Sequence, residues 1–88
     1  MKIPTIHLNG TSREALHQQY KEAWNAVNEA IRVTAQSAPH ARDYYVQDKE
    51  GGERPAIYVA MDEHAARMAA LETVERELME LAVATLGD

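Results

Sequence analysis

The residues best suited to binding another molecule lie together in one short stretch of the chain. Six positions hold a cation, a carboxylate, two phenols and an amide, contributed by Arg42, Asp43, Tyr44, Tyr45 and Gln47. A guanidinium binds phosphate or carboxylate through paired hydrogen bonds, and phenol rings stack on planar heterocycles. A neighbouring carboxylate can accept hydrogen bonds from ribose hydroxyls or base amino groups. The stretch therefore predicts recognition of a small, anionic, planar molecule of the nucleotide type.

A second group of candidate ligand residues lies near the N-terminus. Asn9, Thr11 and Ser12 occupy a turn and the expected start of a helix, where backbone amides without helical partners attract anions. We expect this arm and the loop of a neighbouring subunit to form one pocket. The alternative is that the two tyrosines close the end of a small core while Arg42 pairs with Asp43.

The sequence has no arrangement typical of an enzyme or a metal centre. It contains no cysteine, and Ser12 and Ser37 fall at expected helix ends, where serine usually caps. The four histidines show no metal-ligand spacing on a helix; they are His7, His17, His40 and His64. His64 lies near an apolar helix face, where a buried, hydrogen-bonded imidazole is the simplest interpretation. We expect a protein that is not an enzyme and holds no cofactor or metal.

Two long amphipathic stretches flank the loop and must position it. In the first, side chains recur at spacings of four and three, as in an antiparallel helix pair; they are Leu16, Tyr20, Ala23, Val27, Ala30 and Thr34. A capping box from Thr11 to Glu14 predicts the start of this helix, and Pro39 ends it. Trp24 and Ile31 lie beside the row and widen the apolar stripe beyond what one partner helix covers.

The second stretch continues the same spacing almost to the end of the chain. Its members are Ile57, Met61, Ala65, Met68, Leu71, Val74, Leu78, Leu81 and Thr85. Pro55 suits the first turn of a helix. A competing interpretation pairs residues 44–47 with residues 56–59 as a small β-hairpin. We prefer the helix.

These elements predict a mainly all-α fold, a long antiparallel helical hairpin with a short extended arm. The single domain, 1–88, divides into an arm at 1–10, a first helix at 11–38, a recognition loop at 39–54 and a second helix at 55–87.

The composition indicates that one copy has too small a core. A chain of 88 residues buries only about 60–65% of its unfolded surface, and this one has no phenylalanine and no disulfide. We therefore expect a homo-oligomer that covers the face around Trp24 and Ile31.

The net charge of −5 is concentrated in the last third of the chain. From Ala60 onward there are seven acidic residues and two arginines. An acidic helix repels phosphate backbones, so duplex nucleic acid is not an expected partner. Met1–Thr5 lacks the apolar core of a secretion signal, and no apolar run approaches the roughly 20 residues that span a bilayer. We expect a cytoplasmic protein with no membrane contact.

Three stretches carry a resemblance to known sequences: HLNGTS at 7–12, RDYYVQ at 42–47 and EHAAR at 63–67. Together they resemble a group of short uncharacterised proteins encoded by bacteriophages and prophages. Small phage proteins are often accessory factors that blunt host defence, and some are oligomeric sponges that sequester nucleotide-derived immune signals. The chain is similar to such sponges in size, acidity and expected helical build. The resemblance implies a place of action in the host cytoplasm.

Two hypotheses for function follow. The first is an oligomeric binder that sequesters an anionic nucleotide-derived ligand, such as a cyclic nucleotide or an ADP-ribose derivative. The second is a helical interaction module that contacts a host or phage protein through Trp24, Ile31 and the Met61–Met68 edge. In that case the acidic helix could also imitate a nucleic-acid backbone toward a basic partner.

Overall fold

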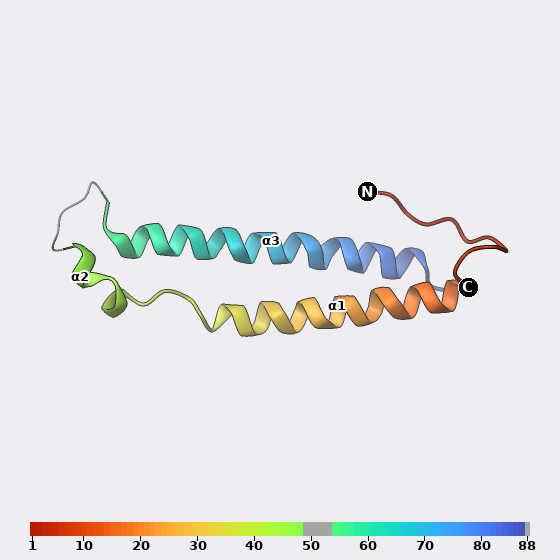
Figure 1. The fold of residues 1–88 in the computed structure, drawn as a ribbon, viewed down its shortest axis with the longest axis horizontal. Helices are drawn as coiled ribbons and strands as arrows, with labels where there is room; N and C mark the ends of the chain where they lie inside the picture. Colours follow the sequence, from red (N-terminus) through yellow and green to blue (C-terminus); the bar gives the residue numbers. More distant parts are fainter. Residues whose placement is uncertain (49–53, 88) are drawn as a thin grey trace.

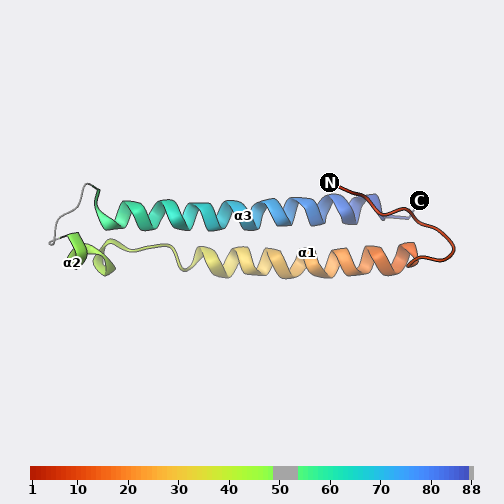
Figure 2. The same cartoon turned by 45° about the horizontal axis from the view of Figure 1, so that its top comes forward.

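Two long helices run antiparallel along almost the whole length of the protein (Figure 1). The computed structural model describes residues 1–48 and 54–87. The long helices are α1 (Arg13–Ala35) and α3 (Ala56–Ala84), and between them come η1 (Ala41–Asp43) and α2 (Tyr45–Asp48). In both views, the turn that precedes α1 and the last described residues after α3 lie at the end away from α2 (Figures 1 and 2). We call that the open end, and the end with η1 and α2 the loop end.

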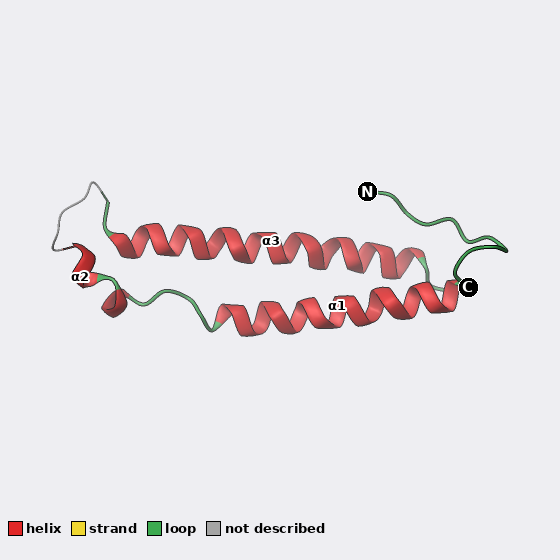
Figure 3. Ribbon diagram, viewed as in Figure 1, coloured by secondary structure: helices red, strands yellow, loops and turns green. Residues whose placement is uncertain are grey.

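The described residues are mainly helical and contain no strand (Figure 3). The predicted fold class and the two long helices are confirmed to this extent. The alternative β-hairpin is wrong, because residues 45–48 and 56–59 are helical. Residues 1–12 form no regular element, and Gly10 N donates to His7 O at 3.1 Å to close the expected turn.

The start and end of α1 each depend on a serine. Ser12 is the N-cap residue, and its hydroxyl accepts a hydrogen bond from Ala15 N at 3.2 Å. The predicted cap, Thr11, was one residue too early. At the other end, the Ser37 hydroxyl donates to Thr34 O at 2.6 Å, just beyond the last helical residue. The helix is therefore a few residues shorter than the predicted 11–38.

The cap at the start of α3 comes from a residue of α2. Pro55 is the N-cap residue of α3 and makes no side-chain cap, but the Asp48 carboxylate accepts a hydrogen bond from Ala56 N at 2.6 Å. A carboxylate at this place also complements the positive end of the helix dipole. The bond therefore fastens α2 to the start of α3.

Three hydrogen bonds between α1 and the C-terminal part of the chain define the register of the helix pair. Arg13 donates to Leu86 O at 3.3 Å, His17 Nδ1 lies 2.8 Å from Ala82 O, and Trp24 Nε1 donates to Glu75 Oε1 at 2.6 Å. The two residue numbers in each pair add to the same value, as one unbroken antiparallel register requires. Extended along the helices, this register places Ile31 opposite Met68.

The helix pair buries very few side chains. Among the described residues, the buried side chains are Ala60, Ala82 and Thr85, and no large apolar side chain is fully buried. The molecule measures 64 × 21 × 19 Å, and its radius of gyration is 19.5 Å, against about 12 Å for a compact domain of this length. None of the helices in the described part of the chain is both long and apolar enough to span a bilayer.

Candidate functional site

The structure keeps the predicted loop residues together at the loop end. Arg42 and Asp43 lie in η1, Tyr44 follows it, and Tyr45 and Gln47 lie in α2. Short-range hydrogen bonds build these turns: Asp43 N donates to His40 O at 3.0 Å, Tyr44 N to Ala41 O and Gln47 N to Tyr44 O, both at 3.1 Å. Two short helices and the residue between them therefore display five side chains of four chemical kinds, which we call the loop-end cluster.

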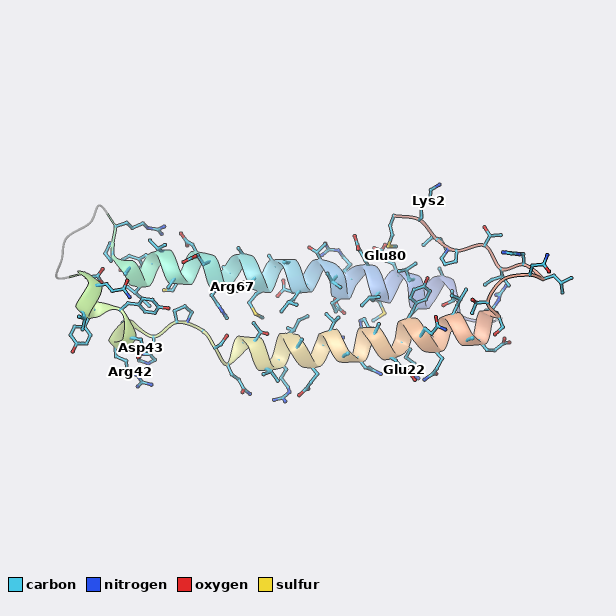
Figure 4. The ribbon with its side chains drawn as sticks, viewed as in Figure 1. Lys2, Glu22, Arg42, Asp43, Arg67 and Glu80 are labelled. Carbon is cyan, nitrogen blue, oxygen red and sulfur yellow. The ribbon has the colours of Figure 1, made fainter. Side chains whose placement is uncertain are left out.

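Most of the loop-end cluster faces solvent. Arg42, Asp43 and Gln47 are exposed, Tyr45 is 56% exposed, and Tyr44 is half-buried. Figure 4 shows Arg42 and Asp43 beside one another, far along the molecule from Glu22 and Glu80. The exposure of Tyr45 argues against the alternative in which both tyrosines close a core.

The pair between Arg42 and Asp43, which belonged to the alternative interpretation, does not form among the described residues. Neither side chain makes a hydrogen bond or ion pair with a residue that the structure describes. The described ion pairs are instead Arg32–Glu29 on α1 and Arg54–Asp62 at the start of α3. Hydrogen bonds from Arg32 hold the pKa of Glu29 below its ordinary value, and the same contact raises the pKa of Arg32.

The sequence interpretation missed a second group of similar chemistry at the loop end. The Arg54 guanidinium carbon lies 6.0 Å from the centroid of the Tyr58 ring, and Arg54 also donates to the Asp62 carboxylate. Tyr58 is 52% exposed. The signal in the sequence was the spacing of four between Arg54, Tyr58 and Asp62, which places them on one side of a helix start.

The arm residues predicted to share the pocket lie at the other end of the molecule. Asn9 belongs to the turn that precedes α1, and Thr11 and Ser12 lead directly into that helix. The arm and the loop-end cluster are thus at opposite ends of a molecule 64 Å long (Figure 1). Within one chain they cannot touch the same small molecule. A pocket made from both needs a second copy.

The structure also corrects the prediction that His64 is a buried, hydrogen-bonded histidine. His17, not His64, is hydrogen-bonded across the helix pair, and because a carbonyl only accepts, Nδ1 carries the proton toward Ala82 O. His64 is half-buried, as its helix position suggested, but it makes no hydrogen bond with any described residue. No group of three histidine, aspartate or glutamate side chains in the described part of the chain could hold a metal ion.

A cavity of about 200 Å³ opens between α1 and α3 at the open end. Its lining is almost entirely apolar; it comprises His17, Lys21, Trp24, Met79, Ala82, Val83 and Leu86. We call it the open-end groove. It is separate from the loop-end cluster and contains none of the residues predicted to bind a ligand.

Comparisons with known proteins assign no family to the chain. None of the protein-family models, curated proteins or solved structures compared with it matched. What the chain binds is therefore inferred from the residues and geometry described above.

Proposed function

We propose that the chain is a non-enzymatic binding protein that holds a small, anionic, planar molecule of the nucleotide type at its loop end. Arg42 donates to phosphate, Asp43 accepts from ribose hydroxyls or base amino groups, and Tyr45 stacks on the base. The observation that supports this most is the exposure of Arg42 and Asp43 together with their lack of a partner. They are exposed neighbours of opposite charge, and neither is paired with a described residue.

The energetics favour a ligand as the partner of Arg42. An exposed ion pair within the protein contributes at most about 1 kcal/mol, because water screens both charges and holding the side chains costs entropy. A charge-assisted hydrogen bond to a ligand phosphate contributes about 1.5–3 kcal/mol. Stacking of a base on an aromatic ring adds about 1–3 kcal/mol. The loop-end cluster offers both kinds of contact, because Arg42 and the Tyr45 ring are exposed.

The second half of the proposed pocket comes from another copy. A helical hairpin that associates with a copy running the opposite way brings the amides and side chains of Asn9, Thr11 and Ser12 toward the neighbouring loop end. Binding without chemical change removes the ligand from solution. That activity suits a phage-type accessory protein that sequesters a nucleotide-derived signal of host defence.

The test is a calorimetric titration of the full chain with a panel of nucleotide-type ligands, including cyclic dinucleotides, ADP-ribose and NAD. We expect one or more to bind, and Arg42→Ala to weaken binding by about 1.5–3 kcal/mol. Arg76→Ala is the matched control, because Arg76 is an exposed arginine of α3 about 30 Å from the start of that helix. It should leave the affinity nearly unchanged.

Two results would count against this function. One is that no member of the panel binds. The other is that Arg42→Ala lowers the melting temperature of the free protein by several degrees, which would mean that Arg42 supports the fold.

Contact with a host or phage protein is the second candidate, and one observation favours it. Met61 is 50% exposed on α3, at the edge predicted to contact a partner, and Met68 on that edge is half-buried. Trp24 lines the open-end groove on α1. In this case Met61→Glu would abolish binding to the purified partner, whereas Arg42→Ala would not.

A further inference from the structure

The molecule exposes more surface than a compact protein of its mass. Its accessible surface is 6663 Å² for a mass of 9.8 kDa. Compact monomers of that mass expose about 5,200 Å², so the surplus is about 1,500 Å². A stable protein–protein interface covers about 800 Å² on each partner. The surplus is thus large enough to supply one partner's share of a large interface.

Part of this surplus lies in the open-end groove. On the α3 side, Met79 is 39% exposed, Val83 57% and Leu86 52%. Trp24 forms part of the α1 side, and its indole N–H is already used by Glu75. What remains open in the groove is therefore almost wholly hydrocarbon, which gains free energy when it leaves water.

Beyond the groove, the same line of α3 carries both apolar and charged side chains, because the exposed Glu72 lies between Met61 and Met79. Met79 and Val83 are four residues apart, so they lie on one side of α3, and Leu86 follows just beyond the end of the helix. Met61 precedes Met79 by five full turns, which places it on the same line, and it is 50% exposed. We call this line the α3 stripe. A copy of α3, roughly 43 Å long for its 29 residues, is long enough to reach from the groove to Met61.

We infer that a second copy of this chain packs against the open-end groove and the α3 stripe. The chain supplies a helix of the required length and an apolar stripe that must itself be covered. Two equal stripes can cover each other about a twofold axis, the commonest symmetry of soluble oligomers. A small molecule or short peptide in the groove would leave Met61 in water. The inference concerns this face alone and does not depend on a ligand at the loop end.

The test measures the mass and thermal stability of the full chain between about 1 and 100 μM. We expect a mass of at least two chains and a melting temperature that rises with protein concentration, because association stabilises only the folded state. Val83→Glu should weaken association on the order of 100-fold, since it would bury a carboxylate among hydrocarbon.

Val33→Glu is the matched control. Val33 is 48% exposed on α1 and lies nine residues from Trp24, about two and a half turns, so it is on the opposite side of that helix. Its substitution should leave the mass unchanged. The proposal is overturned if the wild-type chain keeps the mass of one chain and a constant melting temperature throughout. It is also overturned if Val33→Glu dissociates the protein as strongly as Val83→Glu. The wild-type measurement decides the question even if Val83→Glu does not fold.

Discussion

At the scale of single residues, the contact between Trp24 and Glu75 best shows how the helices are held together. The indole N–H donates to a carboxylate oxygen at 2.6 Å in a part-buried site. Removing the Glu75 carboxylate would leave the part-buried indole N–H of Trp24 without an acceptor. Trp24 is also the only tryptophan, so its fluorescence reports on this contact directly.

Glu75→Ala should lower the free energy of unfolding by about 1–2 kcal/mol, because the indole N–H loses its acceptor. Glu75→Gln keeps an acceptor oxygen and should have a smaller effect. The measurement is urea unfolding at one protein concentration, followed by Trp24 fluorescence. Glu77→Ala is the control, since Glu77 is exposed and makes no bond with a described residue. Equal losses for Glu75→Ala and Glu77→Ala would assign the effect to net charge.

At the same scale, the sequence predicted the chemistry of single residues better than it predicted their hydrogen-bond partners. The exposed chemistry of Arg42 and Asp43 was predictable because it depends on the residues themselves. The bond between His17 and Ala82 was not, because it depends on which turn of α3 lies opposite His17. That is a matter of register, and the periodic spacing of apolar residues fits several registers equally well.

At the scale of elements, Asp48 connects the loop-end cluster to the rigid part of the molecule. Its carboxylate accepts the hydrogen bond from Ala56 N and so replaces the cap that Pro55 cannot provide. Because α2 has only four residues, it cannot be stable alone. The bond to α3 is therefore one of the contacts that hold α2 in position.

Asp48→Ala should destabilise the protein by about 0.5–2 kcal/mol, the usual effect of losing a helix cap. It should also speed hydrogen exchange at the amides of α2 and the first turn of α3, with little change in the middle of α1. Asp43→Ala makes the same chemical change at a side chain without a described partner and should alter neither quantity. Unchanged exchange in Asp48→Ala would show that other contacts hold α2.

The helices themselves were largely predictable, and their ends were less so. Spacings of four and three identified both long helices, since that pattern follows directly from 3.6 residues per turn. The predicted bounds were one to three residues too wide at all four ends. At the start of α1 the cause is capping: Thr11 and Ser12 both belong to the residue types that cap helices, and in the structure Ser12 is the cap. The cap on α3 came from Asp48, which no local rule would connect with Ala56.

At the scale of the whole molecule, the length of the helix pair separates two surfaces with different chemistry. The loop end carries charges and phenol rings, whereas the open end carries a hydrocarbon groove. The sequence predicted a recognition loop and an apolar face around Trp24 and Ile31, and it predicted a pocket made from the arm of one copy and the loop of a neighbouring copy. Their separation follows from the continuous register of two long helices, which also makes a second copy necessary for any pocket that uses both.

The central claim is that the loop-end cluster is a binding site, and chemical-shift mapping tests it most directly. The full chain, labelled with ¹⁵N, would be titrated in turn with ADP-ribose and with a cyclic dinucleotide. We predict that at least one of them shifts amide signals of residues 40–48 and of the first turn of α3, and that Arg42→Ala abolishes these shifts. The absence of shifts with every ligand, or shifts confined to the residues of the open-end groove, would contradict the claim.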